Sequence, residues 1–502
     1  MNTAVAIHAP AALHHAILRW HEDQPVEPLL RKVSFRPAQG ASRGHRWYAS
    51  CFSSEADGRM SGEARGEPET PSDGRARGSG RRRRRTRPGR HRRGAKMKHV
   101  RSGVGQVDTA DSKAAGRGAA EKALANASAD GCNLALAFCG GNHDPIAFLD
   151  SVQEVVGDAT LIGGTAVGVI SNECTGYGGY EAGVAIVSSD DVRFDSVAVG
   201  GLNENELRAG EELGRMLAGK SREDAQAILL FYDSVKSPQP LSVNLASKLI
   251  LGIEKGLDGP HAPVLGGGML RDYQWSGSHV FANGAALTQH AVGLVISGDC
   301  SVYHSISHGC EPASDYHTIT NIEGPIVREL DGRPALDVIE DIIGAGAAKD
   351  WQQYSLLVTL GANYGRDPYG DFNESEYVNR LIAAANPDDG SVILFESDFG
   401  PGEKVQVMRR SNEHMISSAR EMSNDVLSRI DGKEPFLGIY VDCAGRTSGF
   451  SGAGAEEAAI IQETVGSRMP LLGFYSGVEI APFMGGSRAL DWTGVLIVLT
   501  ED

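Results

Sequence analysis

Short apolar runs alternate with amphipathic segments along the chain from Met97 onward. The apolar runs predict strands over 134–139, 159–162, 183–187, 227–232, 264–265, 293–296, 355–360, 391–395, 436–441 and 495–499. Apolar positions at helical spacing predict helices over 112–126, 145–156, 204–217, 241–256, 335–343, 412–430 and 455–465. Strands that alternate with helices indicate an α/β fold, with layered mixed sheets that are covered by helices.

A loose unit recurs three times in this pattern, starting near Leu134, Ala227 and Phe436. Each copy runs as strand, helix, strand ending in glycine, loop and strand. We therefore expect the fold to be built from repeated strand-helix-strand-loop-strand units.

The ends of the repeated strands carry glycine and a few polar residues. Ligands of α/β proteins bind beyond the carboxyl ends of strands, where glycine lets the backbone approach closely. The predicted ligand-binding residues are Gly163, Gly164, Thr165, Gly266, Gly267, Arg271, Cys443, Arg446, Ser476 and Glu479. Each loop taken singly is also compatible with an ordinary tight turn.

Two charged residues near the end of the third copy suggest how a ligand is held. Arg446 is suited to bidentate recognition of a carboxylate. Glu479 can accept hydrogen bonds from an ammonium group. Each is equally compatible with a structural ion pair.

Cysteine and histidine residues offer two other chemistries. Cys443 follows a predicted strand near Arg446, a cation that could lower the pKa of the thiol, so a hydrolase with this nucleophile is an alternative. His304, His308 and Cys310 share one parity on a presumed strand, with His317 nearby, so they are weak candidates for haem or metal ligation. A partly apolar structural environment is the competing interpretation.

The charge of the chain is divided unevenly. Residues 1–101 hold 22 Lys+Arg and 9 Asp+Glu, whereas the remainder holds 26 and 55, so the two parts carry +13 and −29. The acidic part repels phosphate, which argues against nucleic acid as the main partner. Scattered cysteines without a CxxC indicate a reducing, cytoplasmic setting, and no apolar run reaches the roughly 18 residues of a membrane helix.

Residues 1–96 read as a disordered, Arg-rich extension with too little apolar surface to fold. Three explanations compete: an anion-binding or nucleic-acid-binding arm, a solvated tail, and a start codon placed too early. We favour the last, because the ordered pattern begins abruptly at Met97.

The C-terminal part carries four notable strings, namely Gly309-Cys-Glu-Pro312, Glu329-Leu-Asp-Gly-Arg-Pro-Ala-Leu336, Asp442-Cys-Ala-Gly-Arg446 and Gly473-Phe-Tyr-Ser-Gly-Val-Glu-Ile-Ala-Pro482. Together they resemble the FIST sensory proteins. Their order is similar to that of a FIST C-terminal domain, and the Gly-rich strand ends before them are similar to a FIST N-terminal domain. The resemblance predicts a FIST N-like domain over 97–320 and a FIST C-like domain over 321–502.

This resemblance implies a bacterial sensory protein of signal transduction that binds a small ligand, such as an amino acid, and is not an enzyme. Its implied mechanism is closure of the two domains around the ligand, with Arg446 and Glu479 at the ends of a zwitterion. No cofactor is required, but some family members bind haem and sense nitric oxide, which leaves haem open here. Only about 20 residues follow Pro482, so we expect a stand-alone protein that signals through a separate histidine kinase or diguanylate cyclase.

Overall fold

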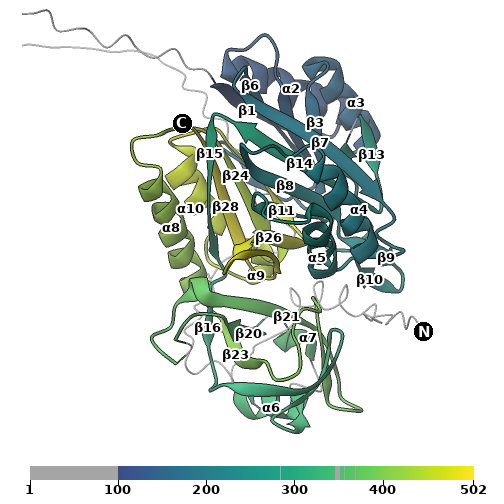
Figure 1. Cartoon of the computed structure of the whole chain (residues 1–502), viewed down its shortest axis with the longest axis vertical. Coiled ribbons are helices and arrows are strands. Elements are labelled where there is room, and N and C mark those ends of the chain that lie inside the picture. Colours follow the sequence, from purple (N-terminus) through teal and green to yellow (C-terminus); the bar gives the residue numbers. More distant parts are fainter. Residues whose placement is uncertain (1–99, 283, 345–350, 356, 368) are drawn as a thin grey trace, which may run out of the picture. The chain divides into compact units, whose positions relative to one another are not determined.

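The computed structural model describes residues 100–282, 284–344, 351–355, 357–367 and 369–502 (Figure 1). The predicted Arg-rich extension, residues 1–96, lies outside the described residues. The predicted helices are present, with two local differences. The segment predicted as a helix over 241–256 begins with a strand, β10 (Leu241–Val243), and its helix starts at Ala246. The segment at 455–465 is an α-helix, α10 (Glu457–Ile461), followed by a π-helical turn, η4 (Gln462–Gly466).

Three six-stranded mixed sheets form the main body of the described chain. The first is ordered β1 (Val100–Asp108), β6 (Glu181–Ser189), β2 (Leu134–Gly140), β3 (Thr160–Ala166), β12 (Val280–Ala282), β13 (Ala285–Leu287). The second is ordered β7 (Val192–Gly200), β14 (His290–Gly298), β8 (Ala225–Asp233), β11 (Val264–Met269), β26 (Val478–Phe483), β27 (Gly486–Leu490). The third is ordered β15 (Cys300–Ser307), β28 (Gly494–Glu501), β24 (Glu434–Cys443), β25 (Leu471–Ser476), β4 (Val169–Ser171), β5 (Thr175–Gly176).

The three sheets repeat one plan, which confirms the predicted internal repeat. The two central strands of each sheet are parallel: β2 with β3, β8 with β11, and β24 with β25. The last two strands of each sheet form a hairpin that comes from a different repeat. The first repeat lends β4–β5 to the third sheet, the second lends β12–β13 to the first, and the third lends β26–β27 to the second. This exchange ties the repeats together, and the sequence pattern did not reveal it.

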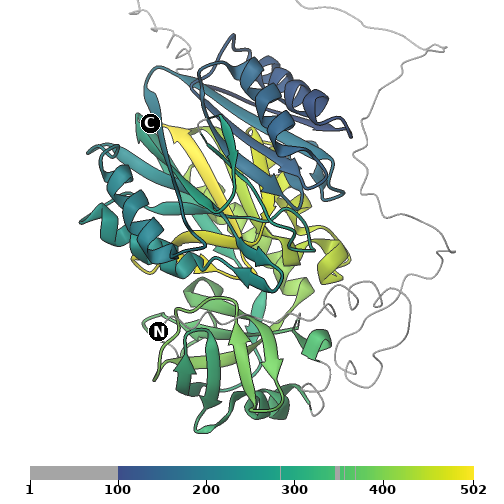
Figure 2. The same cartoon turned by 90° about the vertical axis from the view of Figure 1, so that its right-hand side faces the viewer.

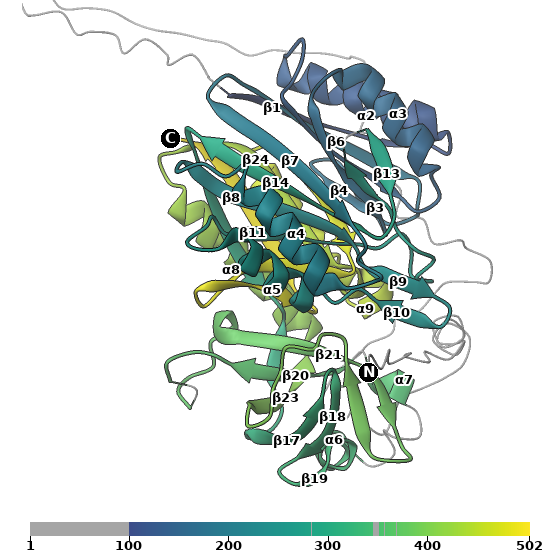
Figure 3. The same ribbon diagram turned by 45° about the vertical axis from the view of Figure 1, so that its right-hand side comes forward.

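Helices cover one face of each sheet, and the opposite faces share a common core (Figures 2 and 3). The first sheet carries α2 (Ser112–Ala127) and α3 (Pro145–Val156), and the second carries α4 (Glu206–Ala218) and α5 (Ala246–Leu257). The third sheet carries α8 (Asn412–Arg429) and α10. On the shared side, the rings of Phe138, Phe231 and Phe474 lie 4.5–5.6 Å apart, one from each repeat. Burial of these three aromatic side chains joins the sheets around one apolar centre.

A barrel is inserted into the third repeat between β15 and α8, over residues 310–410. Its strands are β16 (Cys310–Pro312), β17 (His317–Glu323), β18 (Ile326–Leu330), β19 (Arg333–Pro334), β20 (Val358–Asn363), β21 (Tyr377–Asn386), β22 (Ser391–Leu394) and β23 (Lys404–Arg410). The pairing of β23 with β20 closes the sheet. The inserted segment that forms the barrel also contains α6 (Ala335–Ile343), α7 (Trp351–Tyr354) and a short 3-10 turn, η2 (Glu374–Glu376). The sequence predicted β20 and β22 here but not the other strands of the barrel.

Polar contacts fasten the barrel to the second sheet. Arg380 pairs with Asp398 at 2.6 Å and also donates to the carbonyl of Ala489 in β27. Glu396 accepts from the backbone N–H groups of Ala246 and Ser247, each at 3.0 Å. These N–H groups open helix α5, whose own cap residue supplies no side-chain bond. The barrel therefore caps a helix of the second repeat.

None of the described helices combines the length and the apolar character that crossing a membrane requires.

Candidate functional site

The carboxyl ends of β24 and β25 meet at Cys443 and Ser476, which are partners in the parallel pair. Beyond Cys443 the chain turns through a short 3-10 helix, η3 (Ala444–Arg446). A side chain at Gly445 would lie 2.4 Å from the indole ring of Trp492, so only glycine fits this turn. The turn fixes the position of Arg446 against the start of α10.

Arg446 lies at the centre of a buried ion-pair network. Its side chain is fully buried, and it forms a two-point pair with Glu457, with one contact, from Nε to Oε2, at 2.8 Å. It also donates from Nη1 to the carbonyl of Trp492 at 2.6 Å. Tyr440 donates to the same carboxylate of Glu457 at 3.1 Å. Burial is the largest single influence and opposes the charge of Arg446, but Glu457, Tyr440 and Asp442 together outweigh it and keep the pKa of the guanidinium raised.

Asp442 is fully buried as well, but it lacks the hydrogen bonds of its neighbours. Neither of its carboxylate oxygens has a hydrogen-bond partner among the described residues. Its Oδ1 lies 3.3 Å from Nε of Arg446, at ion-pair distance. Burial raises the pKa of Asp442 well above its ordinary value, and Glu457 adds like-charge repulsion. A buried carboxylate without hydrogen bonds is costly, so this group favours either a proton or a cationic partner.

Glu479 approaches the same region from the second sheet. Its Oε1 accepts from the hydroxyl of Ser476 at 2.5 Å, and its Oε2 accepts from the backbone of Thr493 at 3.1 Å. Burial raises the pKa of Glu479 well above its ordinary value. On β26 it stands opposite Gly267 of β11. The predicted residues Gly267, Ser476 and Glu479 are therefore neighbours.

A short segment covers the network, α9 (Ser448–Ser451), and aromatic residues hold it in place. The hydroxyls of Tyr273 and Thr447 share a hydrogen bond at 2.6 Å, and the ring of Tyr273 stacks on Phe450 with ring centres 5.3 Å apart. The carboxylate of Glu456 accepts from the backbone of Ser448 at 3.0 Å and from Tyr475 at 3.1 Å. Glu456 thus joins α9 to Tyr475 of β25.

Four carboxyl groups therefore gather around Arg446, namely those of Asp442, Glu456, Glu457 and Glu479. If all of them were ionised, the five side chains would carry a charge of −3. Burial raises the pKa of all four carboxyls. We call these five residues the carboxyl cluster. Its excess of acid is suited to binding a cation that carries several hydrogen-bond donors, as an ammonium group does.

Cys443 lies beside this cluster with a thiol that is difficult to ionise. Burial raises its pKa well above the ordinary value, and the Glu479 carboxylate raises it further, while Arg446 lowers it less. A nucleophilic cysteine needs the opposite shift. The hydrolase alternative remains untested, but the surroundings of the thiol do not favour it.

Two other glycines that were predicted to bind the ligand, Gly163 and Gly266, lie where parallel strands of the first two repeats approach closely. Gly163 and Gly266 have φ values of 148° and 142°. A side chain on them would lie 1.8 Å from the carbonyl oxygen of Ala137 and 2.1 Å from that of Leu230. The close approach of parallel strands accounts for glycine at these positions.

The remaining predicted residues of the first two repeats also contact other segments of the chain. A side chain at Gly164 would meet Met269 at 2.4 Å. Thr165 accepts from the backbone of His279 at 3.0 Å, and Arg271 donates from Nε to the carbonyl of Gly141 at 2.7 Å. Their ligand-binding role stays a prediction, because nothing in these contacts tests it.

The histidines proposed as haem or metal ligands do not share one strand, which corrects that expectation. Strand β15 ends at Ser307, and Gly309, with φ of 67°, breaks the chain before β16. Nδ1 of His308 accepts from the backbone of Cys310 at 3.0 Å, and its Nε2 lies 3.1 Å from the carbonyl of Glu374. Both ring nitrogens are therefore occupied.

The other two histidine candidates are His317 and His304. His317 pairs with Asp331 at 2.7 Å, and burial lowers the pKa of His304. In the part of the chain that the structure describes, no group of three or more His, Cys, Asp and Glu is arranged to hold a metal ion. Haem binding is not tested by these contacts and stays a prediction.

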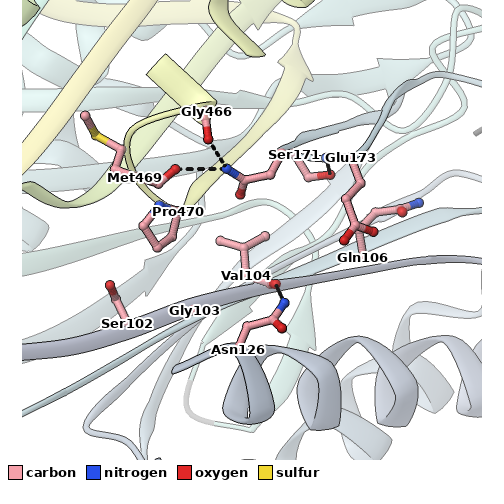
Figure 4. Close-up of a pocket in the computed structure, with 11 residues that line it drawn as sticks. Ser102, Gly103, Val104, Gln106, Asn126, Ser171, Glu173, Gly466, Met469 and Pro470 are labelled. Carbon is pink, nitrogen blue, oxygen red and sulfur yellow. Dashed lines mark hydrogen bonds between the residues drawn. The ribbon is translucent and has the colours of Figure 1, made fainter. Parts of the chain in front are cut away.

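Two cavities lie away from the carboxyl cluster. The one in Figure 4, of about 230 Å³, is lined by residues of β1, α2, the β4–β5 turn and the loop before β25. Its amide groups already bond to the chain: Asn126 donates to Val104 at 2.7 Å, and Asn172 donates to Gly466 and Met469 at 2.8 and 2.9 Å. The other cavity, of about 560 Å³, lies beside the start of β3 and β7 and includes Cys132. Neither is lined by a predicted site residue.

Sequence reasoning missed the partners that define the cluster. Glu456 and Glu457 lie at the start of a segment that was predicted only as an amphipathic helix, 455–465. Two adjacent acids beside an apolar helix face were a signal, but their depth of burial was not visible. Tyr440 lies inside an apolar run, where a hydroxyl gives no pattern of its own.

Two family models match the chain. One, described as the FIST N domain, matches residues 133–333, and the other, described as the FIST C domain, matches residues 335–482.

Relatives and solved structures are more distant. Uncharacterized protein Rv0628c of Mycobacterium tuberculosis (strain ATCC 25618 / H37Rv) is 26% identical over 247 residues, and uncharacterized protein Mb0898c of Mycobacterium bovis is 25% identical over 248. These matches cover 49% of this chain, and the chain spans 62% of the length of these curated relatives.

Among solved structures, a cyanuric acid hydrolase from A. caulinodans matches 80% of this chain and 99% of its own at 11% identity and a TM-score of 0.31. A chorismatase matches 74% and 92% at 10% identity and a TM-score of 0.29. TM-scores this low carry no argument about the present chain.

Proposed function

The chain belongs to the FIST family, and we propose that it is a sensory protein whose small ligand presents an ammonium group to the carboxyl cluster. FIST domains are sensory domains of signal-transduction proteins, which implies that they bind small ligands. To this we add the chemical class of the ligand, a compound that carries an ammonium group.

The observation that carries the proposal is the state of Asp442. This carboxyl is fully buried, and both of its oxygens lack a hydrogen-bond partner among the described residues. Glu457 is already paired with Arg446, so the guanidinium only partly compensates Asp442. An ammonium group would supply the missing donors and reduce the excess negative charge of the cluster.

An amino acid or a related amine is the class of ligand that fits this chemistry. The expectation that Arg446 holds the ligand carboxylate is less favoured, because that carboxylate would compete with Glu457 for the guanidinium. We therefore assign only the ammonium group to this cluster, with Asp442 as its main acceptor and Glu479 as a neighbouring charge.

Signal transfer requires that the ligand binds two states of the protein with different affinity. The segment α9 is positioned to respond, because Glu456 of the cluster accepts from the backbone of its first residue, Ser448. We propose that a separate histidine kinase or diguanylate cyclase reads this change in the cytoplasm.

Thermal unfolding of the full chain with free amino acids, simple amines and small carboxylates tests the proposal. A ligand at a hundred times its dissociation constant stabilises the folded state by about 2.7 kcal/mol. We expect stabilisation by compounds that carry an ammonium group, and loss of that stabilisation in Asp442→Asn.

The control is Asp341→Asn, which changes a carboxylate that is 65% exposed on the surface of α6. This variant should bind like the wild type. If small carboxylates without an amino group stabilise the protein as well as the amino compounds do, the ammonium assignment is wrong.

A further inference from the structure

We propose that Arg410 and Trp492 form a second subsite, which binds the carboxylate of the same ligand. The sensor would then recognise a zwitterion at two separate places. This inference rests on the proposed function, since it assigns the other end of the ligand that the carboxyl cluster holds.

Arg410 lies at the end of β23, and its guanidinium is only partly used. Its Nη2 donates to the carbonyl of Ser451, and its Nη1 is buried without a hydrogen-bond partner. It forms no ion pair with any described carboxylate. Burial lowers the pKa of Arg410 to about 10, which reflects the cost of holding this charge without a counter-ion.

The two arginines whose side chains are fully buried show that this protein ordinarily pairs such charges. Arg380 lies 2.6 Å from Asp398 and 3.9 Å from Asp491. Arg446 pairs with Glu457 and Asp442. Because no described carboxylate pairs with Arg410, we infer that a bound ligand supplies its counter-ion.

Trp492 is the second, independent observation. Its Nε1 is a buried donor without a partner, on a side chain that is 3% exposed. The guanidinium of Arg410 lies over this indole ring, 5.3 Å from its centre. Trp492 also has a φ of 57°, a left-handed conformation that is strained for a bulky residue and that clusters at functional sites.

The chemistry of the two free donors points to a carboxylate. A carboxylate has two oxygens, and each can accept a hydrogen bond, one from Nη1 of Arg410 and one from Nε1 of Trp492. A cation is excluded from this place by the guanidinium. A neutral ligand would leave the charge of Arg410 uncompensated.

Arg446 and α9 link the two proposed subsites. Arg446 pairs with Asp442 and Glu457 and also donates to the carbonyl of Trp492. At one end of α9, Ser448 bonds to Glu456, and at the other end Ser451 accepts from Arg410. A zwitterion that engages both subsites therefore acts on both ends of one short segment.

The test compares amino acids with their primary amides, which keep the ammonium group but lack the carboxylate. Binding to the full chain is measured by thermal unfolding and by titration calorimetry. We expect the wild type to bind the amino acids about tenfold or more tightly than the amides. In Arg410→Gln that preference should vanish, while affinity for the amides changes by less than about twofold.

Arg409→Gln is the matched control, because Arg409 precedes Arg410 directly but is 53% exposed and pairs with Glu311. It should keep the wild-type preference. If Arg410→Gln weakens amino acid and amide equally, or weakens neither, the subsite is overturned even though the proposed function stands.

A different result separates the two proposals. If neither amino acids nor amides bind the wild type, the ammonium assignment fails, and formate then tests the anion subsite alone at constant ionic strength. Stabilisation by formate of the wild type and Arg409→Gln, but not of Arg410→Gln, would support the subsite. Equal response of all three proteins to formate would overturn it.

Discussion

The first two repeats and the third share one sheet plan but differ at one equivalent buried position. Counted along the parallel pairs, Cys139 of β2, Tyr232 of β8 and Asp442 of β24 occupy the same place. The first two repeats fill this place with a neutral side chain under their helices. The third places a carboxyl there. The plan itself does not require a charge, so the departure from the repeat marks the candidate site.

A second comparison shows that two aspartates at similar strand ends have different roles. The carboxylate of Asp233, at the end of β8, accepts from the hydroxyl of Ser278, the backbone of Val235, and the backbone and side chain of Gln289. The carboxylate of Asp442 accepts no hydrogen bond from the described residues. Asp233 therefore holds loops together, whereas the oxygens of Asp442 lack the donors that the proposed ligand would supply.

The largest expected change in stability follows substitution of Arg446, the cation in the buried ion-pair network of the third repeat. Arg446→Met removes the guanidinium and leaves Glu457 and Asp442 buried without their cation. We expect the free energy of unfolding to fall by about 3–5 kcal/mol. Urea denaturation of the full chain, with a check that the slope of the transition is unchanged, measures this.

Arg271→Met, which changes a residue that follows β11 of the second repeat, is the matched control. Arg271 donates one hydrogen bond to the carbonyl of Gly141 and is only half-buried, so its loss should cost about 1 kcal/mol. The double variant Arg446→Met/Glu457→Gln should recover part of the lost stability. Equal losses for Arg446→Met and Arg271→Met would show that the third repeat does not depend on its charges.

Much of the fold could be predicted because the repeated strands and helices carry strong periodicity. The helix over 145–156, for example, has Asp144 as its cap and proline at its first position, both of which are local signals. Among the missed barrel strands, β16, β17, β18 and β19 are short or only partly buried, so their alternation is weak. The strands of the exchanged hairpins are only two to six residues long. Their partners in the other sheets are distant in sequence, as β12 and β3 are, which lie more than a hundred residues apart. No local pattern reports such a pairing.

The candidate site was predictable only in part. Glycine-rich strand ends directed attention to Arg446, Ser476 and Glu479, which the structure brings together. Gly163 and Gly266 were placed in the site by the same signal, although steric crowding against the adjacent strand explains them as well. Arg410 gave no signal, because its lack of a partner depends on which carboxylates the fold brings near it.

The next prediction concerns the pH dependence of stability. It follows from how two equivalent helices of the first two repeats, α3 and α5, are capped. Helix α3 is capped by its own Asp144, whereas α5 relies on Glu396 of the barrel. Burial raises the pKa of Glu396 to about 7, with Asp491 adding repulsion and Arg380 opposing it. The folded state therefore favours the protonated carboxyl. Its stabilising contribution is fully present below the ordinary pKa of 4.5 and is lost as the pH rises through 7.

We expect this group to lower the free energy of unfolding by about 3 kcal/mol between pH 4.5 and pH 7.5, at about 1.4 kcal/mol per pKa unit. Asp491, whose pKa burial raises to about 6, adds a slope of the same sign. Chemical denaturation across this range should give a flatter profile for Glu396→Gln. The control Glu323→Gln changes a side chain that is 74% exposed and should follow the wild type. Parallel profiles for wild type and Glu396→Gln would contradict the assignment.

The smallest expected changes in stability are those of Asp442→Asn and Asp233→Asn, and we expect them to differ in sign. Asp442→Asn should raise the stability of the unliganded protein by about 1 kcal/mol, because it removes a buried charge that lacks hydrogen bonds and keeps an oxygen near Arg446. Asp233→Asn should lower stability by about 1–3 kcal/mol, because its new amide would face groups that are themselves donors. Denaturation of both variants at pH 7 without ligand measures the pair. A loss of stability in Asp442→Asn similar to that in Asp233→Asn would mean that Asp442 is structural. A gain, together with loss of ligand binding, is the trade expected of a residue retained for function.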